Sequence, residues 1–152
     1  MNPLIEEAMT ILEMQVTIHG KPIPCSRPRL GRRGTYMPSD YIAAKEAIIV
    51  QLKAAARVEG WPSEPITGPV SVLMTFVHNR PKRLKKTAGR VLKTTRPDID
   101  NLSKTYLDAM QQAGIFKDDG QVCSLILSDL YAARGEEAHV FLDIRQISME
   151  EQ

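Results

Sequence analysis

The sequence predicts an α+β fold in which a mixed β-sheet carries helices packed on one face, in a single domain over residues 1–152. Its 152 residues are enough to bury a core without disulfides or structural metals. The composition, 43% hydrophobic and 25% charged, is that of an ordinary soluble globular protein. Segments with strand and helix periodicity follow one another in the order β-α-β-α-β-β, which favours a two-layer arrangement.

The N-terminal part contributes the first strand. Residues 1–12 have rough helical spacing of apolar side chains and are expected to form a helical extension. From Met14 to His19, apolar and polar residues alternate, which is typical of a half-buried strand. Gly20 to Pro38 holds four prolines and three glycines, so a loop is expected there.

A first helix follows this loop. Ser39 or Asp40 would cap it, and it would run to about Val58, before the helix-breaking segment that begins at Gly60. The side chains expected to face the core are Ile42, Ile48, Ile49 and Leu52.

The remaining elements alternate in the same way. Val70–Val77 is rich in β-branched and aromatic residues and predicts a strand. Residues 79–95 are basic, contain proline and glycine, and are expected to form a flexible loop. An amphipathic helix is predicted from Asp100 to Ala113. Two further strands are predicted at Val122–Ala132 and Ala138–Ile147.

Basic residues gather in the two predicted loops, although the net charge is only +2. Lys21–Arg33 holds five basic residues and His78–Arg96 holds eight, and neither segment contains an acid. Solvated cationic loops of this kind can bind a polyanion such as DNA. The candidate DNA-binding residues are Arg27, Arg29, Arg32, Arg33, Lys82, Arg83, Lys85, Lys86 and Arg96.

Several classes of protein are disfavoured. Cys25 and Cys123 are too few for a disulfide framework or a zinc knuckle. No window approaches the length of a membrane span, and the N-terminus, with Glu6 and Glu7, does not resemble a signal peptide. We therefore expect no membrane partner and a location in the cytoplasm of a bacterial or phage-infected cell.

Two carboxylates, Asp98 and Asp100, stand one residue apart at the predicted start of the second helix. After Pro97, Asp98 would lie in an extended or turn segment, and Asp100 would lie at the helix N-cap or in its first turn, so both side chains can face one point. Lys104 lies one turn further along the same helix face.

A second acidic group, Asp118 and Asp119, falls at the start of the strand that follows this helix, and we expect the chain's return to bring it back to the first pair. Converging carboxylates repel one another, so such a group indicates a site for a hard cation, Mg²⁺ with Mn²⁺ as an alternative. Taken alone, each piece is more simply a helix cap or a polar turn. Taken together with Lys104, the two pieces favour a metal site.

Three segments carry a family resemblance: Asp98-Ile-Asp-Asn-Leu-Ser-Lys104, Leu107-Asp-Ala109 and Phe116-Lys-Asp-Asp-Gly-Gln-Val122. They closely resemble the RusA family of Holliday-junction resolvases, and Gly20–Arg29 resembles the family's segment after the first strand. The resemblance implies a homodimeric, Mg²⁺-dependent endonuclease that nicks four-way DNA junctions symmetrically in recombination and repair, often encoded by phages.

The resemblance also implies site residues. The family's three essential aspartates fall on Asp98, Asp100 and Asp119, and its essential lysine falls on Lys104. Phe116 stands where many members have tryptophan, and the basic loop is longer than in the shortest members. The whole chain would then be one RusA-like domain.

Three other functions remain open from the sequence. A Mg²⁺-dependent transferase with an Asp-x-Asp pair is disfavoured because no phosphate-cradling glycine loop is present. A non-catalytic protein that binds branched DNA would use the basic loops while its aspartates only capped helices. A nuclease specific for flaps or forks would carry the same site as a junction resolvase.

Overall fold

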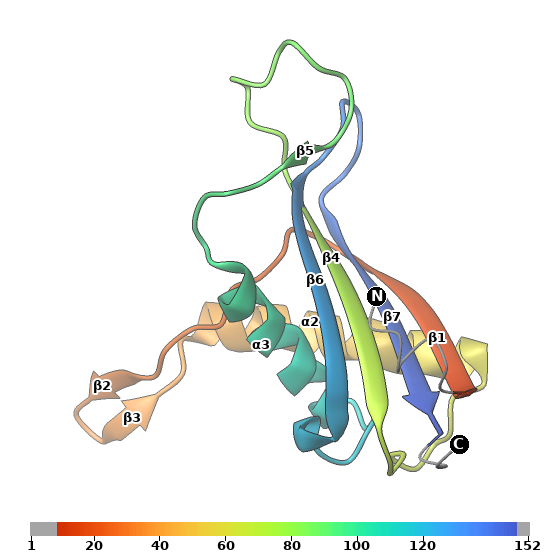
Figure 1. Cartoon of the computed structure of the whole chain (residues 1–152). Coiled ribbons are helices and arrows are strands. Elements are labelled where there is room, and N and C mark those ends of the chain that lie inside the picture. Colours follow the sequence, from red (N-terminus) through yellow and green to blue (C-terminus); the bar gives the residue numbers. More distant parts are fainter. Residues whose placement is uncertain (1–8, 149–152) are drawn as a thin grey trace.

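Five strands form a mixed sheet in the order β1-β7-β4-β6-β5 in the computed structural model, which describes residues 9–148 (Figure 1). β4 pairs with β6 in parallel, and the other neighbours are antiparallel. The strands are β1 Thr10–His19, β4 Val70–His78, β5 Val91–Leu92, β6 Val122–Tyr131 and β7 His139–Ile147.

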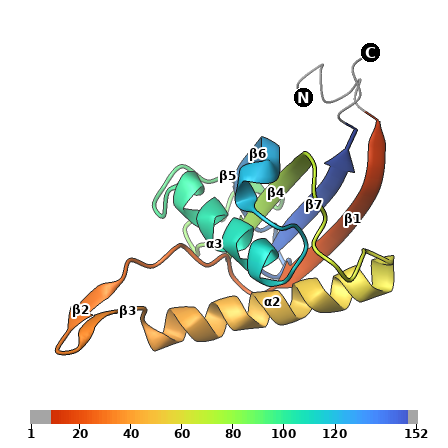
Figure 2. The same ribbon diagram turned by 90° about the horizontal axis from the view of Figure 1, so that it is seen from below.

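Two helices, α2 (Ser39–Glu59) and α3 (Ile99–Gln112), cover the same face of this sheet, as Figure 2 shows from below. A short 3₁₀ helix, η1 (Asp119–Gln121), leads into β6. The predicted α+β arrangement, with helices on one face of a mixed sheet, is confirmed.

The core forms where alternate residues of the central strands meet the apolar stripes of the helices. Val72, Met74 and Phe76 of β4 are almost fully buried, and the ring of Phe76 lies 5.5 Å from that of Tyr106 on α3. Burial of each large apolar side chain contributes about 1.5–3 kcal/mol. In the sequence α3 lies between the parallel strands β4 and β6. Because it also packs against the sheet, the two strands fix where the helix begins and ends.

α2 differs in detail from its prediction. Ile48, Ile49 and Leu52 are buried as expected, but Ile42 is 46% exposed and Tyr41 is buried in its place. The expected side-chain cap is also wrong: the N-cap position is occupied by Pro38, and no side chain makes a capping hydrogen bond.

Three segments expected to be irregular or helical contain strand structure. Thr10–Leu12, expected to be helical, belongs to β1, because this strand pairs with β7 from Thr10↔Ile147 onward and so satisfies its backbone groups. The rest of the predicted N-terminal extension, residues 1–8, lies outside the described residues. The loop after β1 contains a small hairpin of β2 (Arg29–Gly31) and β3 (Gly34–Tyr36), and the basic segment contains β5.

Candidate active site

A pocket of about 560 Å³ opens at the start of α3. One wall comes from β6 with Leu127, Ser128 and Asp129, and another comes from residues 92–95 and Pro97. Asp98 and Asp100 also line it. The end of the sheet and the first turn of α3 thus share one concave surface.

The two aspartates lie as the sequence predicted. Asp98 precedes α3 in an extended conformation with φ −68° and ψ 146°, and Asp100 is in the first turn. Both residues are exposed, and neither carboxylate has a hydrogen bond or ion pair among residues 9–148. Asp98 occupies the N-cap position without capping, so its carboxylate is available to another partner. The partial positive charge of the helix N-terminus lowers the cost of holding two negative charges here.

Lys104 lies on the next turn of α3, on the exposed side of the helix. Within the described part of the chain its ammonium group has no carboxylate partner. A lysine with no internal partner, one turn from the two aspartates, can meet an anion from solvent.

Asp118 is a structural residue of the turn before β6. Its Oδ1 accepts a hydrogen bond from the Gly120 N–H at 2.8 Å, and its own N–H donates to Gln121 Oε1 at 2.8 Å. This capping box agrees with the interpretation of Asp118 as a plain turn residue.

Asp119 does not return to the start of α3 within the same chain. Its N–H donates to Gln111 Oε1 at 3.1 Å, which fixes it near the C-terminal end of the helix. The helix has 14 residues and rises about 1.5 Å per residue, so its ends are about 20 Å apart. The expected convergence of the three aspartates is wrong for a single chain. Consistently, residues 9–148 contain no group of three or more His, Cys, Asp or Glu residues that could hold a metal ion.

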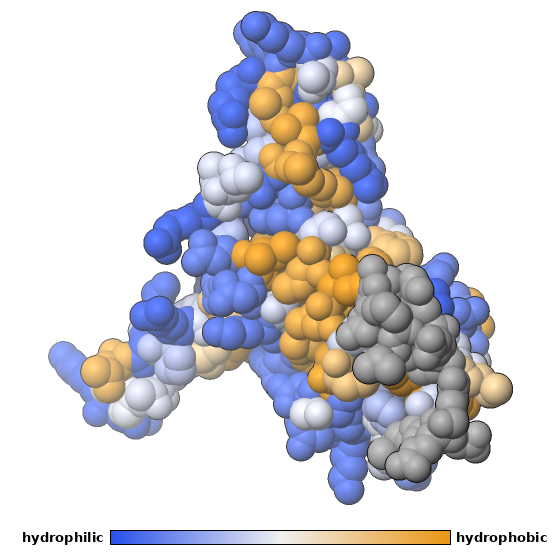
Figure 3. All heavy atoms as spheres, in the orientation of Figure 1, coloured by the Kyte–Doolittle hydropathy of each residue, from blue (hydrophilic) through white to orange (hydrophobic). Residues whose placement is uncertain are grey.

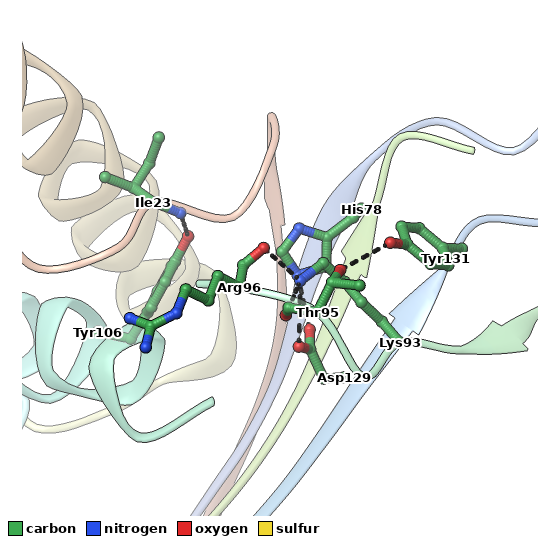
Figure 4. A network of polar contacts seen from close by, with 8 residues as sticks. All are labelled: Ile23, His78, Lys93, Thr95, Arg96, Tyr106, Asp129 and Tyr131. Atoms are coloured by element: carbon green, nitrogen blue, oxygen red, sulfur yellow. Dashed lines mark hydrogen bonds and ion pairs between the residues drawn. The ribbon is translucent and has the colours of Figure 1, made fainter. Parts of the chain in front are cut away.

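A network that the sequence did not indicate includes Lys93 and Asp129, which line the pocket (Figure 4). His78 Nε2 lies 2.6 Å from Asp129 Oδ1, and Lys93 Nζ lies 3.7 Å from Asp129 Oδ2. Only 5% of the Lys93 side chain and 8% of the Asp129 side chain are exposed. Burial lowers the pKa of His78, and this effect outweighs the opposing attraction of Asp129.

Lys93 connects this network to the backbone just before Asp98. Its ammonium group donates to the carbonyl oxygens of Thr95 at 2.6 Å and Arg96 at 3.1 Å. The backbone N–H of Lys93 donates to the Asp129 carbonyl at 2.9 Å. The segment that enters Pro97 and Asp98 is therefore fastened to β6.

The family model of the endodeoxyribonuclease RusA matches residues 19–145, which is most of the chain. The chain belongs to the RusA family of endodeoxyribonucleases. It is also 33% identical over 144 residues to the uncharacterized protein YqaN of Bacillus subtilis strain 168, covering 89% of this chain and 97% of that protein.

In this RusA-family protein, two cationic projections extend beside the pocket (Figure 1). One is the β2–β3 hairpin with Arg29, Arg32 and Arg33, all exposed. The other is residues 80–90, named here the basic arm. Among the predicted DNA-binding residues of the arm, Lys82, Lys85 and Lys86 are exposed and have no carboxylate partner among residues 9–148.

Two arginines hold the basic arm through hydrogen bonds and an ion pair with other groups of the protein. Arg80 donates to the carbonyl oxygens of Leu84 at 3.1 Å, Gly89 at 2.8 Å and Ala132 at 3.1 Å. Arg90 forms a 2.6 Å ion pair with Glu136 in the turn between β6 and β7. Their cationic groups shape the arm, which leaves the neighbouring lysines for an external anion.

Two further predicted residues are Arg83, which belongs to the arm, and Arg96, which precedes Pro97. The guanidinium of Arg83 stands 5.7 Å from the centre of the Tyr131 ring. Arg96 contributes only its carbonyl to the network in Figure 4, and its side chain points away from Asp129.

No helix within residues 9–148 has the length and apolar character needed to cross a membrane.

Proposed function

We propose that this protein is a Mg²⁺-dependent endonuclease that resolves four-way DNA junctions by paired, symmetric nicks, acting as a homodimer in recombination and repair. Its setting would be the cytoplasm of a bacterial or phage-infected cell. The observation that carries the proposal is the pair of uncapped, unpaired carboxylates of Asp98 and Asp100, in a pocket beside two cationic projections. Membership of an endodeoxyribonuclease family supports the reaction class.

The donor set fits a hard cation. Mg²⁺ is held in many phosphoryl-transfer sites by one or two carboxylates, with waters and substrate phosphate completing its coordination, and the carboxylates of Asp98 and Asp100 fit this pattern. Mn²⁺ accepts the same oxygen ligands. When bound, such a cation supplies a water of lowered pKa and stabilises the charge that builds on the phosphate oxygens.

The chain's own residues then have distinct roles. Asp98 and Asp100 would hold the cation. Lys104 binds a phosphate oxygen as a point charge, and the N-terminus of α3 adds its partial positive charge. Asp129, at the end of the sheet, lines one side of the pocket.

Asp119 enters this proposal through the dimer. The structure keeps it near Gln111, at the far end of its own α3. Its carboxylate would therefore contribute to the acid pair of a second copy. A junction has approximate two-fold symmetry, so two sites in a C₂ dimer match the two strands to be nicked.

The open face of the sheet offers a surface for this dimer. Leu73, Ile126 and Phe141 are half-buried and lie on the face away from the helices, since Leu73 pairs with Ile126 and Thr75 with Phe141. In Figure 3 apolar residues gather over these strands. Two such faces packed together would bury the apolar strip.

The test compares a labelled four-way junction, a duplex and a fork, each with Mg²⁺ or with EDTA. We expect paired nicks in the junction with Mg²⁺ only. Asp98→Asn should lower nicking by about 10³-fold, in the range seen when one stabilising group of an active site is lost, while junction binding persists. Glu46→Gln, an exposed acid on α2, is the matched control and should nick as the parent does.

Each other outcome rejects part of the proposal. Nicking by Asp98→Asn at the parent rate would remove the acid pair from the reaction. Preference for the fork would make the protein a nuclease of other branched DNA. Binding without any Mg²⁺-dependent cleavage would leave a non-catalytic junction-binding protein.

A further inference from the structure

The β2–β3 hairpin is built apart from the core. Its two strands pair only with each other, and all six of their residues are exposed. Figures 1 and 2 both show it projecting from the body, beyond the N-terminal end of α2. Isolated two-stranded hairpins are marginally stable in water. A hairpin of this kind gains its stability from a partner that it contacts.

The positive charge of the hairpin region favours a polyanion as its binding partner. Arg27, Arg29, Arg32 and Arg33 lie between residues 27 and 36, where the sequence has no acid. None of their guanidinium groups has a hydrogen bond or ion pair within the described part of the chain. The guanidinium groups of Arg80, Arg90, Arg134 and Arg145, in contrast, donate to carbonyl or carboxylate oxygens of the protein. The hairpin arginines are thus available to phosphates.

An apolar side chain stands among these arginines. Leu30 is 86% exposed, and in the hairpin register it faces Thr35, while Arg29 faces Tyr36 on the opposite side. Tyr36 is 52% exposed and lies against Gly31, where an added Cβ would come within 3.1 Å of the ring. A narrow two-stranded ribbon with cations at its turn and an unburied leucine on one face has the shape and chemistry of a wedge.

The segment that leads into the hairpin is bonded to α3, beside the candidate active site. The Cys25 N–H donates to the Asn101 carbonyl at 3.1 Å, and Asn101 is in the first turn of α3 beside Asp100. The Ile23 N–H donates to the Tyr106 hydroxyl at 3.0 Å, and burial raises the pKa of Tyr106 to about 12. A second pocket, of about 530 Å³, is lined by Arg29 together with Pro97 and Asn101.

We propose that the hairpin enters the branched DNA and inserts Leu30 between bases at or near the branch point, while its arginines hold the flanking phosphates. The inference rests on the proposed function, since it places the wedge relative to the nicked phosphate. A two-stranded ribbon fits a DNA groove, and apolar side chains such as leucine unstack base steps in other architectural complexes. An extended chain spans about 3.3 Å per residue, so Leu30 lies within about 17 Å of Cys25, a distance of roughly five base steps.

The experiment measures base unstacking directly. A four-way junction carries 2-aminopurine, whose fluorescence rises when it unstacks, at the branch point, and the full chain is added in EDTA so that the DNA stays intact. We expect the parent protein to raise the fluorescence severalfold at saturation. Leu30→Ala should lose more than half of this rise while its Kd for the junction changes by less than about threefold, and Leu30→Phe should keep the rise.

The controls separate the wedge from other causes. Val58, 85% exposed on α2, provides the matched variant Val58→Ala, which should behave as the parent. A full fluorescence rise with Leu30→Ala overturns the proposal. A smaller assembly in size-exclusion chromatography of Leu30→Ala alone would instead assign the hairpin to contact between copies, and also overturns it. If the parent protein shows no Mg²⁺-dependent nicking, the proposed function is rejected. The fluorescence measurement tests the insertion of Leu30 separately.

Discussion

The ammonium of Lys93 lies 3.7 Å from the carboxylate of Asp129, with 5% and 8% of these side chains exposed. Lys93 also fastens the Thr95 and Arg96 carbonyls, so it positions the backbone that leads to Asp98. Lys93→Met removes one partner of a buried pair, and we expect a loss of about 3 kcal/mol in unfolding free energy. Displacement of Asp98 by about 1 Å would lower nicking by about 100-fold.

A double variant separates stability from positioning. Lys93→Met with Asp129→Leu removes both charges, so its unfolding free energy should recover part of the loss measured by urea unfolding. Nicking should stay low, with kcat reduced and KM for the junction nearly unchanged, because the fastening of Thr95 and Arg96 is still absent. Parent-level kcat in this stable double variant would show that Lys93 has no positioning role. Lys53→Met, on the exposed side of α2, is the control.

The sequence predicted the features that depend on neighbouring residues. Pro97 and Gly114 delimit α3, so the extended Asp98 and the helical Asp100 followed from local signals, and the structure agrees. The strands β4 and β7 could be predicted because local composition and alternation reflect the buried face that each has. β6 could also be predicted, although its residues are only half-buried or exposed.

The parts that depend on tertiary packing were missed. Nothing near Lys93 marks it as buried, since its partner Asp129 comes from β6 on the other side of α3 in the sequence. The position of Asp119 was predicted wrongly. The chain passes from α3 to β6 through a short turn, so Asp119 stays beside the C-terminal end of the helix. A 14-residue helix then stands between it and Asp98.

Mixing two inactive variants tests the proposed contribution of Asp119 across the dimer. If each site combines Asp98 of one copy with Asp119 of another, a heterodimer of Asp98→Asn and Asp119→Asn has one intact site and one doubly altered site. We expect each variant alone to be inactive and the refolded mixture to recover single nicks in about half of the dimers by random pairing. No recovery in the mixture, with heterodimers verified by mass, would contradict a shared site. The matched control is Glu137→Gln, which should stay active alone.

The salt dependence of binding tests the hairpin arginines as phosphate ligands. Junction affinity should fall steeply with salt, and each phosphate contact contributes about 0.9 to the slope of log K against log salt. Arg32→Ala and Arg33→Ala should each reduce the slope by about that amount. Arg57→Ala, an exposed arginine in the last turn of α2, should leave it unchanged. Equal slopes for all three variants in fluorescence titrations would remove the hairpin from the DNA interface.

A charge on the open face of the sheet tests the proposed dimer. Leu73 is half-buried between Ile126 of β6 and Asp143 of β7. Leu73→Asp would place a second carboxylate beside Asp143 and desolvate it in a dimer, so we expect a monomer by analytical ultracentrifugation. Paired nicking of the junction should fall together with the fraction of dimer. A dimer of unchanged affinity would show that the copies meet elsewhere.

Stability at low pH tests the ion pair that holds the basic arm. The hydrogen bonds from Arg90 lower the pKa of Glu136 from its ordinary 4.5 to about 2. The unfolded chain therefore binds a proton at a higher pH than the folded chain does, and the pair's contribution is complete above about pH 4.5 and is lost as pH falls toward 2. The Arg90 side chain is 43% exposed, so the contribution is at most about 1 kcal/mol. Urea unfolding should show Glu136→Gln less stable than the parent by a constant amount at pH 7 and 5.5, and by a shrinking amount below pH 4.5. Glu137→Gln, which changes an exposed neighbour, should show no such difference, and a gap between parent and Glu136→Gln that persists at pH 2 would contradict the assignment.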